Sequence, residues 1–426
     1  MPIAKAASKP PKIGQRVPEK NINGIWTKKL VQPIQTGVAG QGKTYGCIIK
    51  APSPDFTHVR LVFANQEATP GAITDIAVAV TNSNADKATP STGSGLTNDG
   101  STGWVRGKFS GSNGVTLPAA GADANNPAPL ASDWIPIDSI APTDGSSLPY
   151  LLARVLYSTV FSALYQDMDA STTDKNKAAY METYHTSGTA DAIGTPTLLT
   201  HANKANDPST PFYAFEFLSS KHCIRTACIG DSITAASQGT GVTAGGWWQL
   251  AQDLLIAAGY PVNLFQSAVG GRITSQYCII GKGNIAQHKP AVALYSLWSP
   301  NNGPGGALAG GLTQAVINAA YRDAVDFVNY CRSNDVLPIF TFLAPNDNYS
   351  SADDLLRLSL LTRARNAGMA VIDLSGAVAT NASPQRFQAG MGFDTVHPNG
   401  TGHAAMAASF VSQYLALLQQ SFTLRG

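Results

Sequence analysis

Two short motifs in this sequence carry the residue types that acyl transfer by a serine requires. The first is the Gly-Asp-Ser segment 230–232, which follows the apolar run 223–228 and Ile229. The second is the Asp-Thr-Val-His segment 394–397, directly before the last predicted helix. Glycine permits a tight exit from a strand, so Ser232 would lie at the carboxyl edge of a sheet, where open α/β folds place their ligands. A carboxylate three residues before an imidazole can bond its Nδ1–H and leave Nε2 free to take a proton from a serine hydroxyl.

Each motif also has a purely structural interpretation. Gly, Asp and Ser are common residues at strand-to-turn junctions. The second motif resembles the start of a helix, with Asn399 or Thr401 as the N-cap. That interpretation explains the Pro and Asn that follow His397, but it does not explain why Asp and His precede them. Asp231 is interpreted as a hydrogen-bonding residue that fixes its loop.

Two further loops offer hydrogen-bond donors for an oxyanion. The segment 267–272 follows the second predicted strand, and its glycines can turn a backbone N–H toward an oxyanion. The segment 299–303 follows the third strand, and its Asn301 carries a side-chain amide. With the N–H of Ser232 these make three donors, and removing one such donor typically costs ~2.7–4 kcal/mol of transition-state stabilisation.

The elements that position these motifs alternate between strands and helices from Lys221 onward. Alternation over about 200 residues predicts a parallel sheet covered by helices on both faces. The hydrophobic patterns predict strands at 223–228, 261–265, 291–298, 337–343 and 369–374, and helices at 246–258, 315–332, 352–367 and 401–418.

The chain before Lys221 has an all-β pattern, with short alternating runs separated by turn residues. We predict a flexible leader at 1–24, a β-sandwich domain at 25–220 and a catalytic domain at 221–426. The clearest predicted strands of the first domain are 45–50, 58–64, 73–80, 133–137, 148–157 and 212–217.

Composition narrows the classes of function. A formal charge of +2 argues against binding to nucleic acid or to a membrane surface by bulk electrostatics. Charged residues are only 13% of the chain, which favours a protein that works outside the cell or on a virion surface, although no signal peptide is visible. The five cysteines are widely spaced and predict neither a disulfide framework nor a zinc site. No segment approaches the ~20 apolar residues of a membrane span.

On these motifs the region 222–420 resembles the SGNH (GDSL-type) hydrolase superfamily. Its first block matches 230–232, its second matches Gly271 within 268–272, and its fifth matches 394–397. The third block, usually Gly-x-Asn-Asp, is matched by Ser-Pro-Asn-Asn at 299–302, which departs from the pattern at its first and last positions. The region before it resembles, more weakly, the β-sandwich that precedes the catalytic domain in some exported GDSL-type esterases.

The resemblance implies a three-layer α/β/α, flavodoxin-like domain preceded by a jelly-roll-like sandwich. It implies that Ser232 is the nucleophile, His397 the general base and Asp394 the residue that orients His397. The implied oxyanion hole consists of the N–H groups of Ser232 and Gly271 and the side chain of Asn301, with Gly270 and Asn302 as the rival residues. The implied chemistry passes through an acyl-enzyme and uses no metal or cofactor.

These observations predict a serine esterase whose substrate is an acetyl group on a carbohydrate, or a short acyl or aryl ester. A lipase or lysophospholipase-like esterase is the alternative within the enzyme class, and a non-catalytic surface or tail binding module is the alternative outside it. Trp298 and Trp247 are the predicted substrate-binding residues. His403 lies six residues after His397, which is the wrong spacing for a metal pair and favours a structural role.

Overall fold

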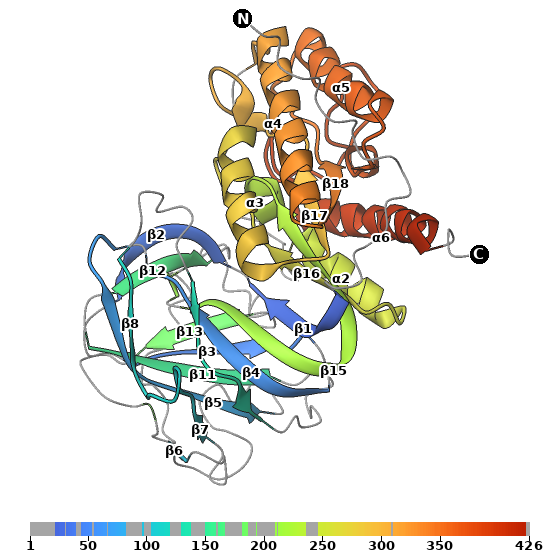
Figure 1. Ribbon diagram of the computed structural model, residues 1–426. Coiled ribbons are helices and arrows are strands. Elements are labelled where there is room, and N and C mark those ends of the chain that lie inside the picture. The colour runs from blue at the N-terminus through green and yellow to red at the C-terminus, as the bar shows by residue number, and fades with distance from the viewer. Residues whose placement is uncertain are drawn as a thin grey trace, which may run out of the picture. The chain divides into compact units, whose positions relative to one another are not determined.

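In a computed structural model the chain forms two compact units (Figure 1). The N-terminal unit spans Asn23–Cys223, and the C-terminal unit contains Ile224 and the residues that follow it, together with Ile22. The predicted boundary lay at 220/221. The predicted leader ends earlier than expected, because strand β1 (Ile22–Lys28) begins inside it, while residues 1–21 lie outside the described part. The structure describes residues 22–29, 31–39, 44–52, 55–65, 67–81, 96–97, 104–119, 129–137, 150–158, 161–166, 181–185, 193, 209–210, 212–235, 246–307 and 310–422.

The C-terminal unit is built on a parallel sheet with the strand order β16-β15-β17-β18-β19. Numbered along the chain from β15, this order is 2-1-3-4-5, the doubly wound order of flavodoxin-like folds. The prediction of an α/β domain with a parallel sheet is therefore confirmed. The strands are β15 (Phe212–Ile229), β16 (Val262–Gln266), β17 (Val292–Ser296), β18 (Leu337–Phe342) and β19 (Val371–Asp373).

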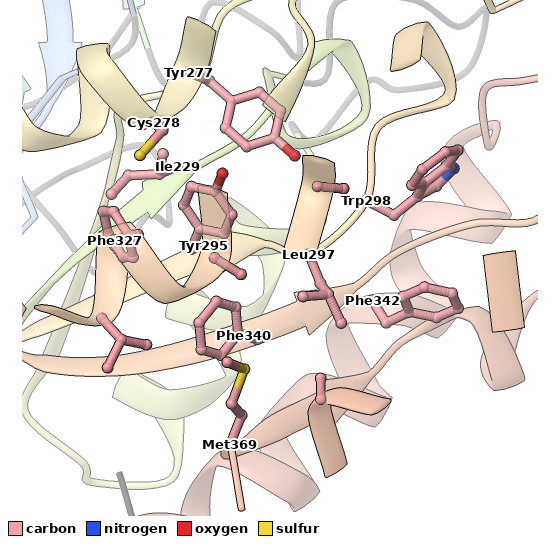
Figure 2. Packing of buried hydrophobic residues seen from close by; sticks show 14 of the residues in the cluster. Ile229, Tyr277, Cys278, Tyr295, Leu297, Trp298, Phe327, Phe340, Phe342 and Met369 are labelled. Atoms are coloured by element: carbon pink, nitrogen blue, oxygen red, sulfur yellow. The ribbon is translucent and has the colours of Figure 1, made fainter. Parts of the chain in front are cut away.

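One face of this sheet carries the main apolar core. Ile229 of β15 is paired with Tyr295 of β17, and Tyr295 with Phe340 of β18, so the three side chains lie on the same face of the sheet. All three belong to one buried cluster (Figure 2). The Tyr295 ring stacks on Phe327 with centroids 4.5 Å apart. Three helices supply the facing side chains: α3 (Thr274–His288), α4 (Gln314–Ser333) and α5 (Ser351–Asn366).

The other face is covered by α2 (Trp247–Ala257) and α6 (Gly400–Phe422). Thr226 of β15 is hydrogen-bonded through its hydroxyl to Tyr414 of α6 at 2.9 Å. The Trp247 and Phe410 rings join the two helices, with centroids 5.2 Å apart. Helices on both faces make this unit the predicted three-layer α/β/α domain.

Helix α3 was not predicted from the sequence, because it contains two glycines and has no clear apolar stripe. Its Gly281 lies against Ile229 of β15, where an added Cβ would come within 2.8 Å of Ile229 Cγ2. The glycine that weakens the helical signal is therefore what allows the helix to approach the sheet closely.

Strand β15 corrects a second expectation. The sequence predicts two strands, 212–217 and 223–228, but the structure has one continuous strand of 18 residues. Its first part pairs antiparallel with β4, and its last part pairs parallel with β16 and β17. The residues between the two parts, Ser220 to His222, are exposed, and this polar segment resembles a loop in sequence although its backbone stays extended.

The described part of the N-terminal unit is all-β. Strands β13-β3-β11-β5-β7-β6 form one sheet, with β8 on β5, and β14-β12-β2 form another. The predicted jelly-roll-like sandwich topology stays a prediction. The strands are β2 (Val31–Ala39), β3 (Thr44–Lys50), β4 (Phe56–Phe63), β5 (Gly71–Thr81), β6 (Leu96–Thr97), β7 (Trp104–Arg106), β8 (Val115–Leu117), β9 (Leu130–Ala131), β10 (Ile135–Pro136), β11 (Tyr150–Tyr157), β12 (Phe161–Gln166), β13 (Met181–His185) and β14 (Ser209–Thr210).

The close approach at Gly281 predicts a loss of stability in Gly281→Ala. Alanine gains about 1 kcal/mol of helix propensity, but forcing a methyl group against Ile229 costs about 1–3 kcal/mol. We expect the free energy of unfolding in urea to fall by about 1 kcal/mol, since the overpacking term is the larger. Gly376→Ala is the control, because an added Cβ there meets no atom within 4 Å.

A double-mutant cycle identifies the cause. Ile229→Ala leaves a space that the methyl group added by Gly281→Ala partly fills, so the double variant should be less destabilised than the sum of the single variants. A stability gain in Gly281→Ala alone would contradict the packing described for α3.

Candidate active site

The turn after β15 presents Ser232 at the carboxyl edge of the sheet. Gly230 is required there, because a Cβ would lie 2.9 Å from Thr234 Cβ and 3.1 Å from Ser296 Cβ. The carbonyl of Gly230 accepts the N–H of Val269 at 3.0 Å, which ties this turn to the loop after β16. Ser232 is the first residue of the short helix α1 (Ser232–Ala235). It lies at the position where the strand order reverses, the place at which doubly wound folds bind their ligands.

Asp231 is fully buried beside the serine. Its Oδ1 accepts the backbone N–H of Ile233 at 3.0 Å, so the carboxyl group fixes the turn. Burial raises the pKa of the Asp231 carboxyl above its ordinary value, because the charged form loses its hydration. The structure thus places this residue where the sequence interpretation put it, in the turn itself.

Ser232, His397 and Asp394 form a continuous chain of hydrogen bonds. The Oγ of Ser232 lies 2.9 Å from Nε2 of His397. On the other side of the ring, Nδ1 lies 2.9 Å from Oδ2 of Asp394 and 3.2 Å from Oδ1. A carboxylate can only accept, so Nδ1 carries the proton toward Asp394 and Nε2 is left as the acceptor for the serine hydroxyl. The three residues are brought together although 165 residues separate the serine from the histidine.

Asp394 also holds its own turn together. Its Oδ1 accepts the backbone N–H of Val396 at 2.7 Å and that of His397 at 2.6 Å. Burial opposes ionisation of this carboxyl, but the hydrogen bonds from the His397 ring and from these two backbone groups outweigh it. The pKa of Asp394 is therefore held below its ordinary value, and the group is a carboxylate at neutral pH.

The two rival asparagines of the third block have different partners. Asn301 Nδ2 donates to Ser299 Oγ at 3.1 Å and to the Arg272 carbonyl at 3.3 Å, which connects it to the loop after β16. Asn302 Oδ1 instead accepts the backbone N–H of Thr274 at 2.9 Å, at the start of α3. The amide of Asn301 therefore lies beside the loop that contains the predicted glycine donor, while Asn302 caps a helix.

Ser299 was identified from the sequence only as a departure from the family pattern. In the structure its Oγ donates to the Arg272 carbonyl at 2.9 Å and accepts the backbone N–H of Asn301 at 3.2 Å. This hydroxyl joins the loops after β16 and β17, a contact that glycine cannot make. The signal in the sequence was the Ser-Pro-Asn order, in which a serine precedes a one-turn helix, η3 (Pro300–Asn302), as its N-cap.

Gly271 has a positive φ of 71°, which explains the glycine at this position. It lies in a turn with Gly270, and it is exposed, while Gly270 is half-buried. The backbone conformation thus distinguishes Gly271 from its rival.

The two predicted substrate-binding tryptophans require a correction. Trp247 is 0% exposed and packs against Phe410 under the sheet, and Trp298 is 4% exposed and belongs to the main apolar cluster. Neither side chain presents a surface to a substrate. The prediction used the position of both residues along the chain, which does not reveal the direction of a side chain.

His403 is buried on the first turns of α6, and its Nδ1 accepts the N–H of Trp247 at 3.2 Å. Burial lowers the pKa of His403 to about 3, and the nearby His397 ring adds to the effect. Within the described residues, no cluster of three or more His, Cys, Asp or Glu side chains could hold a metal ion. None of the helices in this same part of the chain has the length and apolar character to cross a membrane.

Comparisons with known proteins find similar solved structures but no similar sequence. No family model and no curated protein matches the chain. One similar structure is a putative lipolytic protein of the G-D-S-L family from Desulfitobacterium hafniense, 13% identical, with a TM-score of 0.37, covering 45% of this chain and 99% of that chain. Another is the psychrotrophic esterase EstA from Pseudoalteromonas sp., 14% identical, with a TM-score of 0.37, covering 46% and 99%.

A third similar structure is an acetylxylan esterase from Geobacillus stearothermophilus, 14% identical, with a TM-score of 0.34, covering 44% of this chain and 93% of that chain. The first of these three structures is described as a protein of the G-D-S-L family, the family that the sequence motifs resemble.

The buried His403 predicts acid sensitivity of the fold. Its pKa is lowered in the folded state, so the unfolded chain binds the proton more readily and stability is lost as the pH falls from about 6.5 toward 3. In this window we expect His403 to contribute a slope of about 1.4 kcal/mol per pH unit to the free energy of unfolding.

Urea unfolding of wild type and His403→Gln between pH 4.5 and 7.5 measures this slope. The variant keeps an acceptor for the Trp247 N–H and should have a flatter acid limb. His222→Gln, at an exposed histidine, should leave the slope as in wild type. Equal slopes in wild type and His403→Gln would show that His403 is not the acid-sensitive group.

Proposed function

We propose that the C-terminal unit is a serine esterase that hydrolyses carboxylic esters through an acyl-enzyme. The observation that carries the proposal is the unbroken chain from Ser232 Oγ through the His397 ring to Asp394, with 2.9 Å at each junction. A nucleophile, a base in hydrogen-bond reach and a group that orients the base are the requirements for nucleophilic catalysis by serine.

The reaction follows from the proton positions. The Oγ of Ser232 attacks the ester carbonyl carbon while its proton passes to Nε2 of His397, and the imidazolium is stabilised by Asp394. Collapse of the tetrahedral intermediate breaks the bond to the alcohol oxygen, which takes the proton from His397. A water molecule, deprotonated by the same Nε2, then attacks the acyl-enzyme and releases the acid and Ser232.

The oxyanion would be bound by the backbone N–H groups of Ser232 and Gly271 and by the amide of Asn301. Asn301 is the proposed donor because its amide lies beside Arg272 in the loop that contains Gly271. Asn302 stays the rival, since only its Oδ1 is used at the start of α3 and its Nδ2 has no hydrogen-bond partner among the described residues. Donors held by a rigid backbone stabilise charge as it develops without having to reorganise.

The proposed substrate is an acetyl group on a carbohydrate, or a short acyl or aryl ester. A long acyl chain requires a broad apolar surface near the serine. Among the described residues, the exposed large apolar side chains are scattered along the chain, and only Phe393 adjoins a residue of the triad in sequence. The proposed setting is outside the cell or on a virion surface, in keeping with the weakly charged composition.

Hydrolysis of p-nitrophenyl acetate, butyrate and octanoate, with acetate release from acetylated xylan in parallel, tests the function. We expect activity that falls with chain length, and a loss of at least about 10³-fold in Ser232→Ala, because this change removes the proposed nucleophile. Activity that rises toward octanoate would favour the lipase-like alternative. Equal inactivity of wild type and Ser232→Ala on every ester would overturn the proposal in favour of a binding module.

Asn301→Ala and Asn302→Ala separate the two rival asparagines. Loss of one oxyanion donor lowers kcat by about 10²–10³-fold, and we expect this in Asn301→Ala with KM little changed. Asn302→Ala should instead lower the urea midpoint, because it removes the acceptor for the Thr274 N–H. The reverse pattern would assign the donor to Asn302.

A further inference from the structure

The loop that carries Asp394 and His397 has little regular structure of its own. Between β19 and α6 the chain forms only the short helix η4 (Ser375–Ala377) and isolated bridges. A triad nevertheless requires its histidine to be held to within a fraction of an ångström, since a misplacement of 1 Å can cost about 10²-fold in rate. The position of this loop must therefore be fixed by contacts with other elements.

The segment 346–348, just after β18, makes two hydrogen bonds to the turn between the triad residues. The backbone N–H of Asp347 donates to the Thr395 carbonyl at 2.7 Å. The side-chain amide of Asn348 donates to the Thr395 hydroxyl at 2.9 Å. Thr395 is the residue directly after Asp394, so these two bonds hold the triad's acidic residue from the side of the neighbouring strand.

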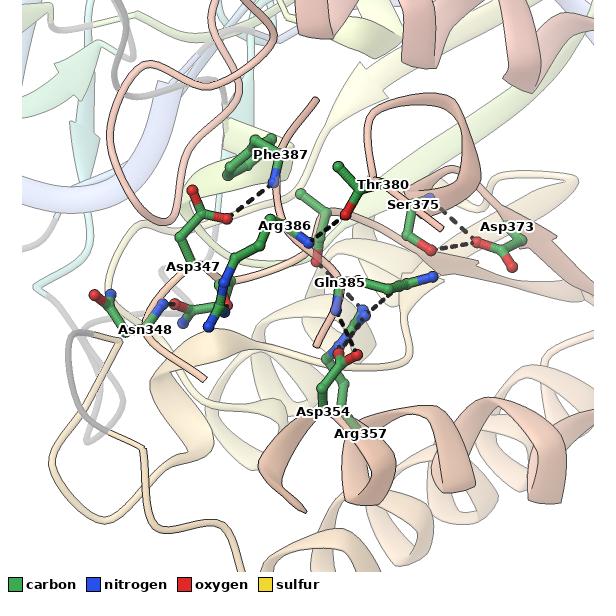
Figure 3. A network of polar contacts seen from close by, with 12 residues as sticks. Asp347, Asn348, Asp354, Arg357, Asp373, Ser375, Thr380, Gln385, Arg386 and Phe387 are labelled. Atoms are coloured by element: carbon green, nitrogen blue, oxygen red, sulfur yellow. Dashed lines mark hydrogen bonds and ion pairs between the residues drawn. The ribbon is translucent and has the colours of Figure 1, made fainter. Parts of the chain in front are cut away.

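The same segment also holds the loop further upstream (Figure 3). Oδ1 of Asp347 accepts the Phe387 N–H at 2.9 Å, and Nη1 of Arg386 donates to the Asn346 carbonyl at 3.1 Å. Asn346 is 2% exposed and is itself fixed, since its Nδ2 donates to the Ala307 carbonyl at 2.8 Å and its Oδ1 accepts the Asn348 N–H at 2.9 Å.

A buried ion pair on α5 anchors the start of this loop (Figure 3). Asp354 and Arg357 are both about 1% exposed, and Oδ1 of the first lies 2.8 Å from Nη2 of the second. Gln385 is bound by both: its N–H donates to Asp354 Oδ2 at 2.8 Å, and its Oε1 accepts from Arg357 at 2.6 Å. The loop is thus attached at Gln385, at the pair Arg386 and Phe387, and at Thr395.

We propose that Asn348 is a positioning residue of the triad, which acts through Thr395 on the Asp394–His397 turn. This inference rests on the proposed esterase function. Thr395 is exposed, and its hydrogen bond with Asn348 lies at the surface. A core-packing role does not explain a hydrogen bond at such a place, whereas its position one residue from Asp394 does.

The experiment is a double-mutant cycle with Asn348→Ala and Thr395→Val, assayed on p-nitrophenyl acetate. Each single change should lower kcat about 10-fold with KM unchanged, and the double variant should be no slower than the slower single variant, because both remove the same bond. Thr395→Ser keeps the hydroxyl and should retain wild-type kcat.

Asn334→Ala is the matched control. Its amide makes an equivalent exposed hydrogen bond, to the Tyr330 carbonyl at 2.9 Å, at the end of α4 before β18. It lies at the opposite edge of the sheet from the triad and should change neither kcat nor KM.

A spectroscopic measurement distinguishes failure of this inference from failure of the esterase proposal. The Nδ1 proton of His397, which is bonded to Asp394, should give a downfield proton resonance in the wild type without any substrate. It should broaden or shift in Asn348→Ala and stay unchanged in Asn334→Ala. A wild type inactive on esters, with a resonance that depends on Asn348, would reject the esterase function and keep the positioning role. An active wild type, with kcat and resonance both unchanged in Asn348→Ala, would reject the positioning role.

Discussion

The hydrogen bond between Ser232 and His397 is the interaction on which the proposed site depends. It joins a turn after the first strand of the C-terminal sheet to a loop before the last helix. This contact can form only if the turn and the loop lie at the same edge of the sheet. In a doubly wound fold all the parallel strands end at one edge, so the segments that follow them lie there together. The three-layer fold is in this sense the device that brings two distant motifs within 2.9 Å.

The sequence predicts the elements whose apolar residues recur periodically, and the contacts between residues that lie close together in the chain. The strands and helices after Lys221 were predicted because apolar residues recur at regular spacing, and Asp394 and His397 could be paired because only two residues lie between them. Helix α3 is not predicted because Gly281, which allows the helix to pack closely against Ile229, is a poor helix former and weakens the helical pattern of the sequence. In the same way the polar residues 220–222 concealed the continuity of β15.

Other parts could not be predicted, because they depend on contacts between segments far apart in the chain. The burial of Trp298 depends on its packing in the main apolar cluster, which several strands and helices form, whereas Trp247 shares a buried face of α2 with Ala251 and Leu255, as their spacing of four residues indicates. The links from Asn348 to Thr395 and from Ser299 to Arg272 join different loops, so no local pattern reports them. The sequence motifs therefore predicted the contact between Ser232, His397 and Asp394 better than they predicted the residues that hold these three in place.

The two aspartates of the site, Asp231 and Asp394, have pKa values shifted in opposite directions by their surroundings. Asp231 is fully buried and has a raised pKa, because the loss of hydration outweighs the hydrogen bonds that its carboxyl group accepts, while Asp394, with two backbone donors and an imidazole, has a lowered one. Asp394 is thus both the partner of His397 and the residue that closes the turn carrying it. Because the same carboxyl group bonds both the His397 ring and the backbone of its turn, few substitutions can replace it. The longer side chain of glutamate could bond the ring only by giving up the backbone hydrogen bonds. A substitution of Asp394 would therefore remove the hydrogen bond to the His397 ring and the conformation of the turn at the same time.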